Sequence, residues 1–473
     1  MQYPTISEYV KASQDASDNL DMSTEATDEE LNEAITDEFG VKYSKDGRKL
    51  LKAPQELDRT YSIRKGTKIV CDMAFAYCKS LSNVVIPDSV TSIGGGAFNE
   101  CDSLRSVVIP DGVTSIGERA FAFSSLSTLV IPDGVNSIDN SAFWGCSSLS
   151  SLVIPDGVTS IGDGAFWGCT SLSSLVIPDS VTSIGNEAFS GCRSLSSLVI
   201  PDGVTSIGDL AFCDCSSLKS LVLPDSVVNL KGNPFCRWNG ELKCLSPYFI
   251  YDNKVLFDKD KSKIIAFRDK DTTSYIIPDY VTSIGDRAFE DCSSLNDIII
   301  SDSVTSIGDN AFEDCSSLND IIIPDSVTSI GNRAFNECDS LRSVVISDGV
   351  TGIGDNAFQF CSSLNDIIIS DSVTSIGIYA FGECSSLSSL VIPDSVTSIG
   401  DWAFYYCDAL RSVVIPDGVT SIGIGAFIGC KSLKSLEIPD SVTSIGFGAF
   451  SYCYFPYKLK QELISRFGEK IFG

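Results

Sequence analysis

The sequence predicts an α/β repeat protein, mostly β, in which short coils stack into a solenoid with two hairpin-led arrays. Three observations predict this class: a 23-residue pattern that recurs along most of the chain, strand-like spacing of apolar residues inside each copy, and two similar hairpin sequences that each precede a run of copies. A period in this range is typical of solenoids, whose coils bury their apolar side only against neighbouring coils.

The repeat is complete in residues 171–192, which read SLSSLVIPDSVTSIGNEAFSGC. Its Ala-Phe pair marks the period, because within each array the Phe recurs every 23 residues, apart from one step of 22 between Phe121 and Phe143. The repeat phenylalanines are Phe75, Phe98, Phe121, Phe143, Phe166, Phe189, Phe212 and Phe235, then Phe289, Phe312, Phe335, Phe358, Phe381, Phe404, Phe427 and Phe450.

The spacing inside one repeat predicts the shape of the coil. Residues 172–177, LSSLVI, have the alternation of a strand, with the leucines facing the core and Val176 facing away from it. The Pro-Asp pair then ends the strand, because proline donates no ladder hydrogen bond and aspartate bonds to nearby backbone N–H groups. Residues from Val181 to Cys192 return to the core. Each large apolar side chain contributes about 1.5–3 kcal/mol when buried, so the stack is stable although one coil is not.

The pattern L-x-x-L-x-I-P-x-x-V-x-x-I-G-x-x-A-F-x-x-C resembles the BspA-like class of leucine-rich repeat proteins, over about residues 61–453. The resemblance implies a right-handed curved solenoid with a parallel sheet on its concave side. It also implies a non-enzymatic bacterial protein, on the cell surface or secreted, that binds a protein or glycan in adhesion or in host or cell-surface interaction. The family has no common catalytic residues, so the resemblance implies none here.

The charge of the chain excludes several classes of function. Its 473 residues include 34 Lys and Arg, 62 Asp and Glu and no His, for a formal net charge of −28. Nucleic acid and anionic membranes attract clustered basic residues, so we expect neither as a partner. Without histidine there is no Ser-His or Cys-His catalysis and no histidine metal site. We therefore expect no enzyme activity, no cofactor and no metal, and no membrane insertion, because no apolar run reaches about 18 residues.

The first residues, MQYPTISEYV, lack the basic start and the apolar run of about 7–15 residues of a secretory signal. Two interpretations remain open. The protein lies on the cell surface or is secreted, as the resemblance implies, and this numbering begins after a removed leader. Alternatively it is cytoplasmic and acts as an intracellular protein-protein interaction scaffold.

The ends of the chain depart from the repeat. Residues 1–40 indicate an acidic, mobile segment, with a short helix expected from Asp28 to Asp37 because Thr27 and Glu30 form a capping box. Residues 454–473 have apolar side chains at helical spacing, which predicts a capping helix over the end of the core. A free helix that binds a partner is the alternative.

Between these ends we expect four parts. Residues 41–238 hold a hairpin, with its turn at Lys45-Asp46-Gly47, and the first array, and residues 239–274 hold an insert with a second hairpin at 255–267. Residues 275–453 form the second array. We favour a core that continues through the joint at 229–244, with two semi-independent halves as the alternative.

Two polar columns have both a structural and a functional interpretation. One aspartate follows the strand in nearly every coil, from Asp88 to Asp440, and stacking would place these in a row. One carboxylate per coil is far from the about six to eight oxygens that calcium takes, so a repeated turn cap is favoured over calcium sites. Fourteen of the 18 cysteines share another column and are expected to be buried thiols. Cys213 and Cys236 share a slot on adjacent coils, where a disulfide is the alternative.

The concave side is the expected ligand-binding surface. A column of β-branched residues runs along it and includes Val153, Val176, Val199, Ile299 and Ile322. If exposed, such a column indicates a protein or glycan partner, or self-association through the concave or end surfaces. The alternative is that β-branched residues simply suit strands.

Charged and aromatic residues add to this expectation. Beside the apolar column, serine gives way in the second array to Asp297, Asp320 and Asp366, which favours a basic partner there. Four more carboxylates are near them in sequence: Glu290, Asp291, Glu313 and Asp314. Trp144 and Trp167 share one slot on adjacent coils and are either binding anchors or corner packing.

Overall fold

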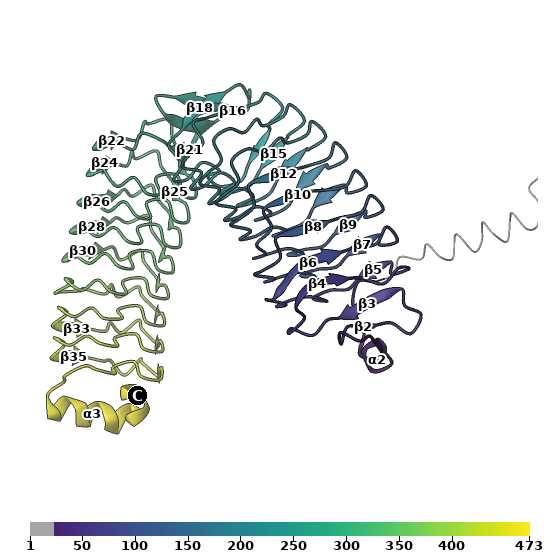
Figure 1. Cartoon of the computed structure of the whole chain (residues 1–473). Coiled ribbons are helices and arrows are strands. Elements are labelled where there is room, and N and C mark those ends of the chain that lie inside the picture. The colour runs from purple at the N-terminus through teal and green to yellow at the C-terminus, as the bar shows by residue number, and fades with distance from the viewer. Residues whose placement is uncertain (1–22) are drawn as a thin grey trace, which may run out of the picture. The chain divides into compact units, whose positions relative to one another are not determined.

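The computed structural model describes residues 23–473, which divide into two compact units. Of these residues, unit 1 contains those up to Val227 together with Gly240–Leu242, and unit 2 contains Val228–Asn239 and Lys243–Gly473. Both units consist of stacked coils with parallel pairing, so the mostly-β solenoid predicted from the repeat is confirmed (Figure 1).

The described part of the N-terminal segment is ordered against the first hairpin. Helix α2 (Asp28–Asn32) has the predicted capping box, in which Thr27 Oγ1 accepts from the Glu30 N–H at 3.2 Å. The helix is shorter than predicted, because β1 (Ile35–Thr36) follows it and pairs antiparallel with β2 (Lys42–Tyr43). An ion pair of 2.9 Å between Lys49 and Glu30 also joins the helix to the first hairpin. Residues 1–22 lie outside the described part.

The hairpins lead into the coils through parallel pairing. In unit 1, β2 pairs antiparallel with β3 (Lys49–Lys52), which pairs parallel with the first coil. In unit 2, β19 (Phe249–Asp252), β20 (Val255–Asp258) and β21 (Lys263–Phe267) form an antiparallel group, and β21 pairs parallel with the next coil. Each hairpin therefore presents a formed edge on which the first coil stacks.

The longest sheets join the Ser-Ile positions of successive coils, which the sequence analysis placed in the core without assigning a strand. In unit 1 these strands are β5 (Ile69–Val70), β7 (Ser92–Ile93), β9 (Ser115–Ile116), β11 (Ser137–Ile138), β13 (Ser160–Ile161), β14 (Ser183–Ile184) and β15 (Ser206–Ile207). In unit 2 they are β23 (Ser283–Ile284), β25 (Ser306–Ile307), β27 (Ser329–Ile330), β29 (Gly352–Ile353), β31 (Ser375–Ile376), β32 (Ser398–Ile399), β34 (Ser421–Ile422) and β36 (Ser444–Ile445). The register advances one repeat per strand, since Ser160 pairs with Ser183.

The L-x-x-L segments form shorter parallel ladders than predicted. In unit 1 the strands are β4 (Arg59–Ser62), β6 (Leu81–Val85) and β8 (Ser106–Val108), then β10 (Thr128–Val130) and β12 (Ser151–Val153), then β16 (Ser220–Leu223). In unit 2 they are β22 (Ser274–Ile276) and β24 (Asp297–Ile299), then β26 (Asp320–Ile323), β28 (Ser343–Ile346) and β30 (Asp366–Ile369), then β33 (Ser412–Val414) and β35 (Ser435–Glu437). Two strands lie at the joint: β17 (Asn229–Leu230) and β18 (Glu241–Cys244).

The core of each unit is a column of stacked phenylalanine rings. The ring of Phe335, fully buried, lies 5.0 Å from that of Phe312 and 5.1 Å from that of Phe358, with interplanar angles of 4° and 3°. A column of cysteines packs beside the rings, and the Cys338 thiol donates to the Phe312 carbonyl of the preceding coil at 3.2 Å. Most coils are therefore held to their neighbours by a ring contact and a thiol hydrogen bond; the coil of Phe121, where Ser124 takes the cysteine position, lacks the thiol.

The end of unit 2 is covered by helix α3 (Tyr457–Phe467) and the 3-10 helix η1 (Glu469–Phe472). Leu463 and Ile471 are buried in the same core cluster as the coils of unit 2. The N–H of Phe450 donates to the Ile471 carbonyl at 2.8 Å, so η1 provides the last coil with a backbone acceptor of the kind that a further coil would provide.

Candidate functional site

The predicted apolar row is exposed along the L-x-x-L segments in both units, on strands at Val153, Ile299 and Ile322 and outside regular strands at Val176 and Val199. Val176 is 80% exposed and Ile322 is 65% exposed, and Val153, Val199 and Ile299 are also exposed. The residues on either side of each of them point into the core, as the period of two in a strand requires. The side chains of the row are therefore not part of the core, and no described side chain covers them.

The aspartates after the strands follow this row in both units, but only unit 2 also has carboxylates two residues before the exposed apolar residue. Asp297, Asp320 and Asp366 are the exposed first residues of β24, β26 and β30. Ser343 pairs with both Asp320 and Asp366, so the acidic column has one serine in it. At the same place unit 1 has serines such as Ser151. We call the exposed apolar row of unit 2 and its three aspartates the acidic strand face.

A shallow groove of about 340 Å³ opens in the strands of unit 1 where the repeat is one residue short. The strands β8 and β10 belong to separate ladders, and the groove between them is lined by Val108, Asp111, Thr128 and Val130. The 22-residue step therefore interrupts the strand pairing and adds a hollow to the apolar row.

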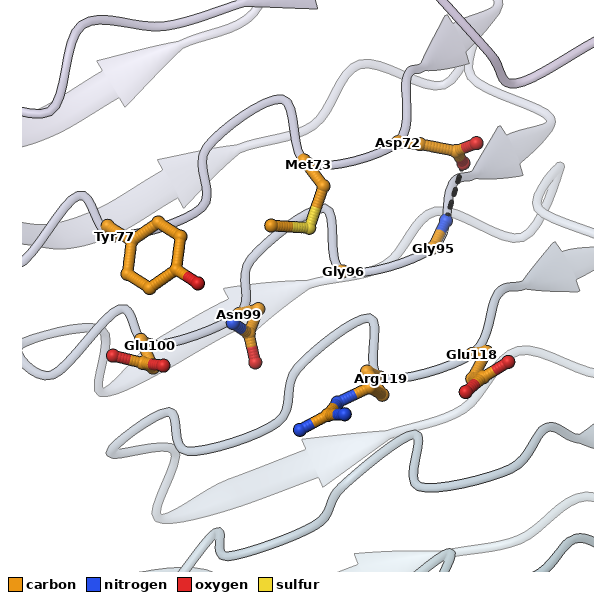
Figure 2. A pocket seen from close by; sticks show the side chains of 9 residues that line it. All are labelled: Asp72, Met73, Tyr77, Gly95, Gly96, Asn99, Glu100, Glu118 and Arg119. Carbon is orange, nitrogen blue, oxygen red and sulfur yellow. Dashed lines mark hydrogen bonds between the residues drawn. The ribbon is translucent and has the colours of Figure 1, made fainter. Parts of the chain in front are cut away.

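The turns after the Ser-Ile strands carry a second hollow, which the sequence analysis missed. It occupies about 430 Å³ in unit 1, where Gly95 and Gly96 stand between Asp72 and Met73 of one coil and Glu118 and Arg119 of the next (Figure 2). We call it the glycine notch. The Gly-Gly pair in a column of Asp, Asn and larger residues is the signal that could have indicated it.

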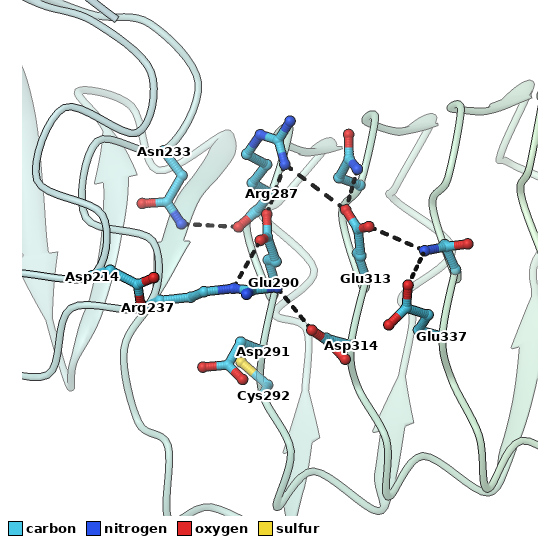
Figure 3. A network of polar contacts seen from close by, with 12 residues as sticks. Asp214, Asn233, Arg237, Arg287, Glu290, Asp291, Cys292, Glu313, Asp314 and Glu337 are labelled. Atoms are coloured by element: carbon cyan, nitrogen blue, oxygen red, sulfur yellow. Dashed lines mark hydrogen bonds and ion pairs between the residues drawn. The ribbon is translucent and has the colours of Figure 1, made fainter. Parts of the chain in front are cut away.

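On the same turns in unit 2, carboxylates are neutralised by arginines (Figure 3). Glu290 is only 6% exposed and lies 2.9 Å from Arg287 Nη1 and 3.2 Å from Arg237 Nε. Arg237 Nη2 also reaches Asp314 at 2.7 Å. Glu313 is likewise close to an arginine, 3.8 Å from Arg287. The expectation that these carboxylates add to the attraction of a basic partner is therefore wrong for Glu290, Glu313 and Asp314.

The predicted tryptophan pair lies apart from the strand row. Trp144 and Trp167 are half-buried on the turns after the Ser-Ile strands, with ring centroids 4.8 Å apart. The Trp144 ring lies over Gly164, at 3.0 Å from where a Cβ would be, and Arg119 lies 5.9 Å from its centroid. The structure therefore brings the two rings together, but not with Val153 or its neighbours.

The aspartates after the strands do not make the predicted caps. The turn is closed by backbone, as where the Val181 N–H donates to the Pro178 carbonyl at 3.1 Å, and Asp179 is exposed. A different column, after Ile-Gly, bonds successive coils: the Asn186 N–H donates to Asp163 Oδ1 at 2.7 Å. Within residues 23–473 no group of three or more acidic, cysteine or histidine side chains is placed to hold a metal.

Burial keeps most thiols of the cysteine column protonated, but Cys292 is an exception, because a hydrogen bond with Cys315 and the nearby Lys270 ammonium lower its pKa. All the cysteines, Cys213 and Cys236 included, are free in the structure. Burial raises the pKa of Cys146 to about 11 and that of Cys192 to about 12. A thiol with so high a pKa is protonated at neutral pH and is neither a nucleophile nor a metal ligand.

These columns can be compared with known repeats. The family described as BspA type leucine rich repeat region matches residues 67–196, 182–245, 263–388 and 351–473. The chain belongs to the BspA-type leucine-rich repeat family. Proteins of the BspA type are bacterial surface proteins, and leucine-rich repeat proteins are generally non-enzymatic binding scaffolds.

Solved structures of bacterial leucine-rich repeat proteins are similar to this BspA-type chain. A leucine-rich repeat protein from Eubacterium ventriosum is 25% identical, with 80% of this chain and 91% of that chain covered and a TM-score of 0.50. A leucine rich cell surface protein from Faecalibacterium prausnitzii is 28% identical, with coverage of 85% and 94% and a TM-score of 0.46. No curated protein matches the chain. In the described part of the chain, the helices are too short or too polar to cross a membrane.

Proposed function

We propose that this BspA-type solenoid binds a protein partner through the acidic strand face of unit 2, in adhesion or another interaction at the cell surface. The observation that carries the proposal is the exposed row of Ile299, Ile322 and Ile368 beside the carboxylates of Asp297, Asp320 and Asp366.

The chemistry of this face favours one kind of partner. A long exposed aliphatic row is more than a monomer usually leaves in water, and it gains free energy when an apolar surface covers it. The adjacent carboxylates select lysine or arginine and repel acidic segments. The row contains isoleucine and valine and no aromatic ring, which favours apolar side chains over sugar rings. The partner that fits is a protein segment with both basic and large apolar side chains.

The surface location rests on the family and has its own test. The free thiols favour a second candidate, an intracellular interaction scaffold, because a reducing compartment keeps thiols unpaired. Intact source cells are treated with a membrane-impermeant amine reagent, and this protein is sought among the labelled species. Labelling supports the surface protein, whereas an unlabelled protein recovered in the cytosol refutes it and supports the scaffold.

The binding face is tested by selecting a phage-displayed peptide library on the full chain. We expect the recovered peptides to combine Lys or Arg with large apolar residues. Their affinity should fall at least tenfold for the triple variant Ile299→Ser, Ile322→Ser, Ile368→Ser, because the apolar contact area is lost.

The matched control is Val153→Ser, Val176→Ser, Val199→Ser, which changes the same column of unit 1, where serines stand at the positions of Asp297, Asp320 and Asp366. This variant should bind the peptides as the unchanged protein does. Equal binding by the unit 2 variant, or an equal loss in both variants, refutes the acidic strand face as the binding site.

A further inference from the structure

The glycine notch of unit 1 has a filled counterpart in unit 2. Residues 97–109 and 334–346 have the same sequence, AFNECDSLRSVVI. The two residues before this segment differ, being Gly95 and Gly96 in unit 1 and Asn332 and Arg333 in unit 2. The same segment therefore occurs once with and once without a cationic side chain directly before it.

In unit 2 this arginine lies among satisfied polar groups. Arg333 Nε is 4.0 Å from Glu313 Oε1, and the Asn336 amide donates to Glu313 at 3.0 Å and to Glu337 at 3.3 Å. The carboxylate of Glu313 thus lies between an amide and a guanidinium. Here the protein supplies its own cation.

In unit 1 the same coil lacks these partners. Asn99, the counterpart of Asn336, is 7% exposed, and its side chain makes no hydrogen bond in the structure; Oδ1 is buried without a partner. Ala76 stands where unit 2 has Glu313, so the second carboxylate is absent as well. Figure 2 shows the amide oxygen of Asn99 directed into the space between Asn99 and Arg119. Asn336 Oδ1 also lacks a partner, so what distinguishes the notch is the unbonded amide nitrogen and the absent cation.

The charge and walls of the notch indicate what it would take. Three carboxylates line it, from Asp72, Glu100 and Glu118, against the one guanidinium of Arg119. Asp72 Oδ1 accepts from the Gly95 N–H at 2.7 Å, but Glu100 and Glu118 have no ion-pair partner within residues 23–473. The exposed sides of Met73 and Tyr77 form an apolar wall on the opposite edge. Thus an excess of negative charge lies next to an aromatic ring and a thioether.

We propose that the glycine notch binds an organic cation, an alkylammonium or guanidinium group on an aliphatic stem, which takes the place that Arg333 occupies in unit 2. The cation pairs with Glu100 and Glu118 and donates to Asn99 Oδ1, while its stem packs along Met73 and Tyr77. A cation beside a tyrosine ring and unpaired carboxylates gains from both interactions. Such a group is presented by a lysine or arginine side chain of a partner or by a free polyamine.

The test measures weak binding to the full chain by saturation-transfer NMR and isothermal titration. The probes are N-acetyl-arginine amide, N-acetyl-lysine amide and spermidine, with N-acetyl-citrulline amide as the neutral analogue. We expect the charged probes to bind at one site, at least tenfold more tightly than citrulline. Tighter binding of the amino-acid amides assigns the notch to a protein partner, and tighter binding of spermidine assigns it to a free polyamine.

Two variants locate the binding. Gly96→Arg places a guanidinium in the notch at the position of Arg333, without the Glu313 carboxylate of unit 2, and the backbone suits it, because Gly96 has φ 58° and Arg333 has φ 55°. A Cβ there would clash with Met73 Sδ, so the flexible Met73 side chain has to move aside, while Asn99 Cβ stays at ordinary contact distance. Glu100→Gln removes one charge at the surface. We expect each variant to weaken the charged probes at least tenfold, and Glu337→Gln, in the identical segment of unit 2, to leave them unchanged.

Other outcomes overturn the proposal. No binding, equal binding of citrulline, or equal binding by the unchanged protein and Gly96→Arg each refute it; the last would show that the net charge of −28 attracts the probes. The notch lies on the turns and not on the L-x-x-L strands, and its residues differ from those of the acidic strand face. Failure of one proposal therefore leaves the other standing.

Discussion

The stacked phenylalanine column makes a quantitative prediction at Phe335. Its fully buried ring lies between those of Phe312 and Phe358, at 5.0 and 5.1 Å. Phe335→Leu keeps most of the buried apolar area but loses both ring pairs, each of which contributes about 0.5–1.5 kcal/mol beyond burial. We expect the free energy of unfolding of unit 2 to fall by about 1–3 kcal/mol. Phe335→Ala adds a cavity, and its cost should reach about 3–5 kcal/mol.

The assay is urea unfolding followed by circular dichroism and tryptophan fluorescence. A long repeat array can unfold in more than one step, so the midpoint and slope of each resolved transition are compared. The control is Phe447→Ala, which removes a phenylalanine that is 62% exposed and should change stability by no more than about 0.5 kcal/mol. If Phe335→Leu costs no more than this control, ring stacking does not stabilise the column and the reasoning is refuted.

Three further predictions concern single residues. Burial raises the pKa of Cys192 to about 12, so the stability present below about pH 9 is lost as pH rises toward 12, and Cys192→Ala should reduce this loss in alkaline urea titrations. A Cβ at Gly354 would lie 2.7 Å from the backbone of the coil before it, so Gly354→Ala should lower the thermal midpoint of unfolding. Gly352→Ser restores the repeat sequence and should be neutral or stabilise the protein by about 0.4–1 kcal/mol. A thermal midpoint that is higher for Gly354→Ala than for Gly352→Ser would contradict the close stacking of the coils. Arg237→Ala removes one of two cations beside the buried Glu290 and should cost about 1–3 kcal/mol in unit 2; no change would mean that the remaining arginine suffices.

Sequence periodicity predicted the positions that face the core, because the same side chain must pack against its own copy in the next coil. Phe335 and Cys338 are buried for this reason, and the repeat spacing alone indicates it. The period does not say which backbone groups pair. The Ser-Ile ladder therefore went unassigned, and the parallel L-x-x-L sheet that the resemblance implies is divided into separate ladders.

Side-chain pairing was harder to predict, because it depends on contacts between residues far apart in sequence. Arg237 and Glu290 belong to different segments, and only the fold brings them within 3.2 Å. The sequence therefore overestimated the free acidic charge of the second array. It also assigned the capping role to Asp179, whereas Asp163 makes the bond between coils, because the geometry of stacked turns decides which carboxylate reaches an N–H.

For the apolar row, the sequence left a binding role and strand propensity as equal explanations. The structure shows that the row is exposed, with Val176 80% exposed, and strand propensity accounts for β-branched residues at exposed positions as well. The glycine notch was missed for another reason: a Gly-Gly pair such as Gly95-Gly96 is unremarkable unless the walls of the neighbouring coils are known.

The most direct test of the central claim is hydrogen exchange on the full chain with and without a peptide recovered from the phage selection. Binding at the acidic strand face predicts slower exchange of amides in β24, β26 and β30, at 297–299, 320–323 and 366–369, and unchanged exchange in β12 of unit 1. Slower exchange confined to the turns after the Ser-Ile strands, or to the strands of unit 1, would contradict the assignment of this face as the binding surface.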